Sequence, residues 1–186
     1  TLPVSSAALP SSGAATGFAA DGSTPGTLTV TGANTAAGNA TVTIDGTAHT
    51  AALTLPVSSA SLPSSGGATA FASTAADNVI TVTAVPTANG NVTVNIDGND
   101  YTAAITDTDW SAETATTTAA KITTALNAIS SFPFTVTSSG AAITVAHTAS
   151  STASQVVSKL NALSGTADVP FELTSSGAAI SIAHTA

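Results

Sequence analysis

The chain has 186 residues, of which 43% are hydrophobic, mostly alanine and valine, 4% are aromatic and 6% are charged. Ten acidic residues against two lysines give a net charge of −8, which argues against nucleic acid and against an anionic membrane surface as partners. The chain has no cysteine for a disulfide framework, and no apolar run approaches the ~18–20 residues of a membrane-spanning helix.

The chain repeats itself, and such internal similarity indicates a modular architecture. We predict three domains: a first repeat over residues 1–53, a second over 54–149, and a shorter helix–hairpin copy over 150–186. The matching segments are 1–7 (TLPVSSA) with 54–60, 41–46 (TVTIDG) with 93–98 (TVNIDG), and 134–140 (FTVTSSG) with 171–177 (FELTSSG).

In chain order, each of the first two repeats opens with a Pro/Ser/Gly-rich segment, residues 1–26 and 54–78, which we expect to be extended connectors or edge segments. A β-hairpin follows in each, around Asp45-Gly46 and Asp97-Gly98. Asp-Gly between alternating segments is a strong hairpin signal, because a type I′ turn needs positive φ at both central residues. This turn sets Val94 opposite Tyr101 and Val92 opposite Ala103 in the second repeat, and Val42 opposite His49 in the first.

The period then changes to that of an amphipathic helix between residues 110 and 130. Thr114 or Ser111 is the expected N-cap, and Pro133 ends the helical segment. A hairpin with its turn at Ser139-Gly140 follows, which sets Val136 opposite Ile143. The apolar stripe of the first helix is Ala119, Ile122, Leu126 and Ile129.

The last part of the chain repeats this order in shorter form. A helix carries the apolar positions Ala153, Val156, Val157, Leu160 and Leu163. A hairpin about Ser176-Gly177 then sets Leu173 opposite Ile180. The predicted fold class is therefore α+β and β-dominated, with tandem repeated antiparallel hairpins and two short amphipathic helices.

The hairpin at residues 91–105, the Ala/Thr-rich helix with Ala120-Lys121-Ile122, and the strands at 134–137 and 143–146 together resemble a hairpin–helix–hairpin module. Such modules occur in tailed-phage virion proteins, including contractile tail-sheath subunits and related appendage proteins. The resemblance covers residues 90–149, and it implies a role in packing between subunits. It carries over no functional residue.

Motifs for catalysis are missing: the sequence has no nucleophile elbow, no zinc-binding helix motif and no phosphate loop. We expect the three histidines to be structural, because Tyr101 takes the place of His49 in the other repeat, and His147 and His184 end matching strands beside Phe132 and Val169. We therefore expect no catalytic residue, no cofactor and no enzyme activity.

Two other patterns are candidate sites. Asp97, Asp100, Asp107 and Asp109 form the densest group of carboxylates, together with Glu113, and a calcium site is the functional hypothesis against a solvated acidic loop. Asn39 and Asn91 begin glycosylation sequons at equivalent places, either as modification sites or as products of Thr-rich repetition. Trp110, the only tryptophan, is expected to anchor the thin core.

These observations lead us to expect a structural subunit of a virion or extracellular assembly whose partners are copies of itself and other structural subunits. The mechanism is strand addition, with the duplicated LPVSSA segment as the candidate intersubunit strand. The alternatives are a cell-surface adhesin or surface-layer-like binding module and a free extracellular filament.

Overall fold

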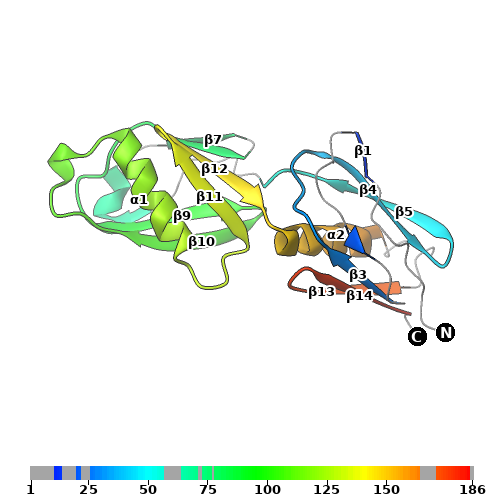
Figure 1. Ribbon diagram of the computed structural model, residues 1–186. Helices are drawn as coiled ribbons and strands as arrows, with labels where there is room; N and C mark the ends of the chain where they lie inside the picture. Colours follow the sequence, from blue (N-terminus) through cyan, green and yellow to red (C-terminus); the bar gives the residue numbers. More distant parts are fainter. Residues whose placement is uncertain are drawn as a thin grey trace. The chain divides into compact units, whose positions relative to one another are not determined.

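The computed structural model describes residues 11–13, 20–21, 26–56, 64–70, 73–76, 78–163 and 171–184 (Figure 1). The chain forms two compact units. One, here called the split unit, combines Thr1–Leu55 with His147–Ala186, and the other, the inserted unit, is Pro56–Ala146. The inserted unit therefore interrupts the sequence of the split unit.

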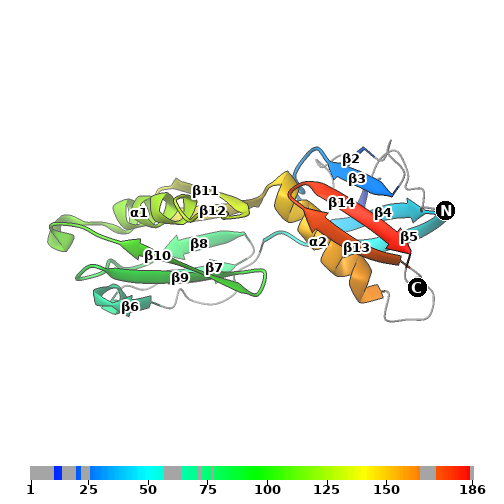
Figure 2. The same cartoon turned by 90° about the horizontal axis from the view of Figure 1, so that it is seen from below.

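The inserted unit contains a three-stranded sheet in the order β10-β9-β6 and a four-stranded sheet in the order β11-β12-β8-β7. Helix α1 packs against β10 and β11, which are edge strands of the two sheets (Figure 2). Its elements are β6 (Ser64–Gly66), the 3₁₀-helix η1 (Gly67–Ala70), β7 (Ser73–Ala76), β8 (Val79–Val82), β9 (Gly90–Ile96), β10 (Asn99–Ile105), the 3₁₀-helix η2 (Trp110–Ala112), α1 (Ala115–Asn127), β11 (Phe134–Ser139) and β12 (Ala142–His147).

The split unit has the same topology, with sheets in the orders β1-β4-β5 and β13-β14-β3-β2. Helix α2 packs against β5 and β13, as α1 does against β10 and β11. The elements are β1 (Ser11–Gly13), β2 (Ala20–Asp21), β3 (Thr27–Val30), β4 (Gly38–Ile44), β5 (Thr47–Leu53), α2 (Ala149–Leu163), β13 (Phe171–Ser176) and β14 (Ala179–His184).

The sequence repeats thus correspond to one fold that occurs twice, with one copy inserted into the other. Strands β4 and β9 share one pattern of burial along their seven residues, and β5 and β10 share another. The first predicted repeat, 1–53, and the short copy, 150–186, belong to the same compact unit. The short copy supplies the helix and hairpin that the first repeat lacks.

The chain is α+β and β-dominated, as predicted, with antiparallel hairpins and two short helices. The Pro/Ser/Gly-rich segments were predicted to be connectors or edge segments. Their short strands β1, β2, β6 and β7 do each lie at the edge of a sheet. Residues 1–10 and 57–60 lie outside the described residues, and with them most of the candidate intersubunit strand.

The two Asp-Gly hairpins are confirmed. Asp45 and Asp97 have φ of 48° and 51°, and the glycines after them have φ of 81° and 83°, as a type I′ turn requires. Val94 pairs with Tyr101 and Val42 with His49.

The predicted turns of the later hairpins are wrong by one residue. The strand bounds put the turns at Gly140-Ala141 and Gly177-Ala178, and positive φ is confined to the glycine in each. Glycine at the first central position is the signature of a type II′ turn. The register consequently shifts by two, so that Leu173 pairs with Ile182 and Phe171 with His184. A shift of two leaves every side chain on its predicted face.

Both helices are confirmed. Thr114 caps α1 in a capping box with Thr117, and Thr148 and Ser151 exchange the same bonds at the start of α2. The predicted stripes are buried, except that Ile129 and Val157 are only partly buried and Leu163 is 40% exposed. Each unit therefore has its own core beneath its own helix.

An asparagine near the end of each helix covers a sheet edge. The Asn127 side chain donates to the Val136 carbonyl at 2.8 Å and accepts from the Val136 N–H at 3.3 Å. Asn161 makes the same two bonds to Leu173, at 2.7 and 3.1 Å. A carboxamide thus takes the place of a neighbouring strand at the edges of β11 and β13.

We expect Asn127→Ala to destabilise the inserted unit by about 1–3 kcal/mol, because it leaves both backbone groups of Val136 without their partner. Urea unfolding followed by Trp110 fluorescence measures this loss, since the only tryptophan lies in that unit. Asn161→Ala is the matched control, and a fall in the Trp110 midpoint for that variant would contradict the assignment.

Candidate functional site: the acidic loop and the groove beside helix α1

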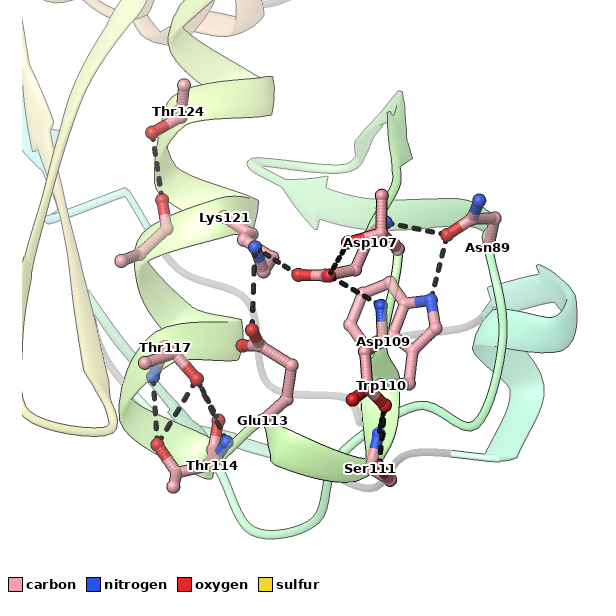
Figure 3. A network of polar contacts seen from close by, with 12 residues as sticks. Asn89, Asp107, Asp109, Trp110, Ser111, Glu113, Thr114, Thr117, Lys121 and Thr124 are labelled. Atoms are coloured by element: carbon pink, nitrogen blue, oxygen red, sulfur yellow. Dashed lines mark hydrogen bonds and ion pairs between the residues drawn. The ribbon is translucent and has the colours of Figure 1, made fainter.

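Residues 106–113 connect β10 to α1 and carry three carboxylates, Asp107, Asp109 and Glu113. Asp107 forms an ion pair with Lys121 at 2.5 Å, and Lys121 lies 3.6 Å from Glu113. The Asp107 carboxylate also accepts the Asp109 N–H at 2.9 Å. These contacts, drawn in Figure 3, tie the loop to the second turn of the helix.

Trp110 holds the same loop from the other side. Its indole is 8% exposed and belongs to the core, as expected of an anchor. The indole Nε1–H donates to the Asn89 Oδ1 at 2.8 Å, and the same oxygen accepts the Asp107 N–H at 2.7 Å (Figure 3). Asp109 accepts the Ser111 N–H and so caps η2.

These contacts set the electrostatics of the loop. The backbone N–H of Asp109, and next the Lys121 ammonium, hold the pKa of the Asp107 carboxyl well below its ordinary value of 3.8. The hydrogen bond to Asp107 in turn raises the pKa of Lys121. The Asp107 carboxylate already accepts hydrogen bonds from these groups. This arrangement suits a structural contact better than a general base.

The four aspartates proposed for calcium do not form one cluster. Asp97 lies in the β9–β10 turn, and Asp100 accepts a hydrogen bond from Asn95 at 2.8 Å. Asp107 and Asp109 follow the other end of β10, and a strand of seven residues is about 20 Å long. Within the part of the chain that the structure describes, no three His, Cys, Asp or Glu side chains are grouped to hold a metal ion.

His147 and His184 occupy matching positions in the sequence but differ in burial. His147 is 4% exposed, with Nε2 donating to the Thr54 carbonyl at 3.1 Å and Nδ1 2.9 Å from the Ser151 hydroxyl. His184 is exposed and its ring lies against that of Phe171, with centroids 4.9 Å apart, while His49 meets the same Phe171 edge-on at 6.3 Å. Val169, the predicted neighbour of His184, lies outside the described residues. Tyr101 makes the corresponding edge-on contacts in the inserted unit, which agrees with a structural role for the ring.

Both sequon asparagines are exposed. Asn39 lies in β4 opposite Ala52, and Asn91 lies in β9 opposite Ala104, so the two occupy equivalent places on the solvent face of equivalent sheets. Their glycosylation stays a prediction.

An open groove of about 520 Å³ lies between the end of β10 and the exposed face of α1. Its walls are mostly alanine and threonine, with Lys121 and Glu113 as the charged groups. No prediction from the sequence included this groove, although the small residues on the polar face of the predicted helix were a signal for it. The lining residues are Ala104, Ile105, Thr106, Glu113, Thr117, Ala120, Lys121, Thr124, Ala125 and Ala128.

The split unit closes the corresponding place with neutral side chains. The matching N-caps and asparagines of the two helices align Gln155 with Lys121. The matching strands β5 and β10 align Thr54 with Thr106. Gln155 Nε2 donates to the Thr54 carbonyl at 3.1 Å and to its hydroxyl at 2.9 Å. The ion pair of Lys121 in the inserted unit thus corresponds to the amide hydrogen bonds of Gln155 in the split unit.

Comparison of the chain with family models, with curated proteins and with solved structures finds no match. No helix among the described residues is long and apolar enough to cross a membrane.

Lowering the pH will weaken the contacts that the Asp107 carboxylate makes with Lys121 and the Asp109 N–H. Because the pKa of Asp107 is lower in the folded than in the unfolded chain, the stabilisation is present above about pH 4 and is lost as the pH falls toward the folded pKa. We expect Asp107→Asn to have a lower urea midpoint than the wild type at pH 7 and a smaller deficit at pH 3, by Trp110 fluorescence. A deficit that does not change with pH would contradict this electrostatic role.

Proposed function

We propose that this chain is a structural, non-catalytic subunit of a virion or extracellular assembly, such as a phage tail, a fibre or a capsid decoration, and that it associates with copies of itself through strand edges. The observation that carries the proposal is the pair of long edge strands β5 and β10. Each has seven residues, lies at the end of its sheet and contains neither lysine nor proline. Soluble monomers protect such edges with those residues, with bulges or with covering elements.

The contrast with the other edges supports this proposal. Asn127 and Asn161 cover β11 and β13 with side-chain amides. The exposed alternate positions of β5 and β10 are instead Ala48, Thr50 and Ala52, and Asp100, Thr102 and Ala104. With only 6% charged residues in the chain, little charge is desolvated when such surfaces meet. The resemblance of residues 90–149 to modules of tailed-phage virion proteins favours the virion among the extracellular assemblies.

Density-gradient fractionation of the native source, with mass spectrometry for this chain and electron microscopy of its fractions, tests the proposal. Co-migration with DNA-filled particles is the expected result. Recovery in DNA-free fibres would replace the virion by a free filament, and recovery as a soluble monomer would contradict assembly and favour a surface binding module.

Edge variants test the mechanism in purified protein. We expect Thr50→Lys with Thr102→Lys, which places one charge on each open edge strand, to lower the sedimentation coefficient of the assembled chain to that of a monomer. Thr41→Lys with Thr93→Lys puts the same charges on the central strands of the same sheets and serves as the matched control. Equal loss of assembly in both pairs would point to net charge and not to the edges.

A further inference from the structure

The groove beside α1 borders the end of β10, an edge strand that has a strand partner on one side alone among the described residues. In a two-residue hairpin, the residues that flank the turn are hydrogen-bonded to each other, and the pairs then alternate. Ile96 pairs with Asn99, so Thr102 and Ala104 fall in the non-hydrogen-bonded pairs and direct their N–H and C=O groups away from β9. The 2.8 Å bond between the Thr93 and Thr102 hydroxyls agrees with the closer approach expected at such a pair.

The walls of the groove leave room for an added strand. Ala120 and Thr124 on α1 and Ala128 directly after it are exposed and line the groove, and none of them is larger than threonine. Lys121 turns to Asp107 and Glu113, so the charges at this end neutralise one another in part (Figure 3). A volume of about 520 Å³ lies within the range that ligand sites occupy. The groove therefore suits an uncharged extended segment with small side chains.

The split unit differs at the end of its edge strand. There the Thr54 carbonyl, at the end of β5, accepts bonds from Gln155, His147 and the Asn34 side chain. In the inserted unit the corresponding Lys121 points to Asp107 instead, and no side chain of the described residues bonds to Thr106. The end of the edge strand is thus engaged by side chains in the split unit, whereas among the described residues the end of β10 borders the groove.

We propose that this groove accepts residues 1–9 (TLPVSSAAL) of a second copy, which add to the edge of β10 as an extra strand. This inference rests on the proposed self-association and names its donor and acceptor. The segment has no charged side chain, and Leu2 and Val4 share one face when it is extended. Nine extended residues span about 30 Å, and the edge from Thr102 to Thr106 needs about 16 Å. Backbone hydrogen bonds then supply affinity, and the small side chains of the groove select against bulky or charged segments.

Cross-linking of full-length chains tests this proposal, because the protein has no cysteine of its own. A tagged Val4→Cys chain is mixed with an untagged Thr124→Cys chain under mild oxidation, so that a tagged–untagged disulfide can only join two copies. We expect this heterodimer to form readily. The control acceptor is Thr135→Cys, another exposed threonine, which lies on β11 of the same unit and outside the groove. Similar yields at Thr124 and Thr135, or none at Thr124, would overturn the proposal.

Filling the groove gives an independent result. Ala120→Arg in the Thr124→Cys acceptor should reduce the heterodimer to the level of the Thr135 control, because arginine keeps the helix but occupies the groove. An unchanged yield would overturn the assignment of the groove. Sedimentation of the wild-type chain separates this failure from failure of the proposed function: assembly without the 4–124 cross-link rejects the donor and acceptor alone, whereas a chain that stays monomeric rejects self-association itself.

Discussion

A chain that ends at residue 147 will lose the split unit and keep the inserted unit. The truncation removes α2, β13 and β14, and with them Val156, Leu160, Phe171, Leu173, Ile180 and Ile182 from one core. Strand β3 loses its pairing with β14. The inserted unit keeps every strand of its sheets and its own core. We expect an unchanged Trp110 fluorescence transition in urea, together with a far-UV circular dichroism amplitude reduced by the share of the split unit.

The converse deletion is the control. Removing residues 56–146 and joining Leu55 to His147 through a short Gly-Ser linker should leave the split unit folded. The two ends are already adjacent, since His147 Nε2 donates to the Thr54 carbonyl at 3.1 Å. Domain insertions are tolerated where the ends of the insert lie close together. Loss of the Trp110 transition in the truncated chain, or of all cooperative unfolding in the deleted chain, would show that the units do not fold separately.

The local elements of this fold follow from turn chemistry and periodicity. Asp97-Gly98 predicts its turn and the whole register of β9 and β10, because two consecutive positive φ angles leave one solution. The turn predicted at Ser176-Gly177 was wrong by one residue, because glycine also serves as the first central residue of a type II′ turn. The apolar pattern is the same in both pairing registers and so does not distinguish them.

The long-range pairing could not be predicted in the same way. Strands β3 and β8 carry short alternating segments, but nothing in them identifies β14 and β12 as their partners. Those two pairings connect the early and late parts of each unit, so the insertion of one unit into the other is visible only in three dimensions. The acidic site shows the same limit. Asp97 and Asp107 are near in sequence, yet a strand separates them, whereas Lys121 reaches Asp107 from the helix.

A matched pair of core substitutions measures how far the two copies of the fold are independent. Leu126 in α1 and Leu160 in α2 occupy equivalent positions, each one residue before the asparagine that covers a sheet edge, and they are 0% and 2% exposed. Truncation of a buried leucine to alanine removes its packing and leaves a cavity, at a cost of about 2–5 kcal/mol. We expect Leu126→Ala to lower the free energy of unfolding, measured by urea titration with Trp110 fluorescence, by that amount.

Leu160→Ala should leave the Trp110 transition in place and lower the stability seen by far-UV circular dichroism, which reports both units. Thr124→Ala, an exposed position on α1, is the control for substitution within the first helix and should change stability by less than about 0.5 kcal/mol. If Leu160→Ala shifted the Trp110 midpoint as strongly as Leu126→Ala, the two units would unfold as one cooperative body. The duplicated fold would then behave as a single domain, and the strand edges of both copies would become exposed together on unfolding.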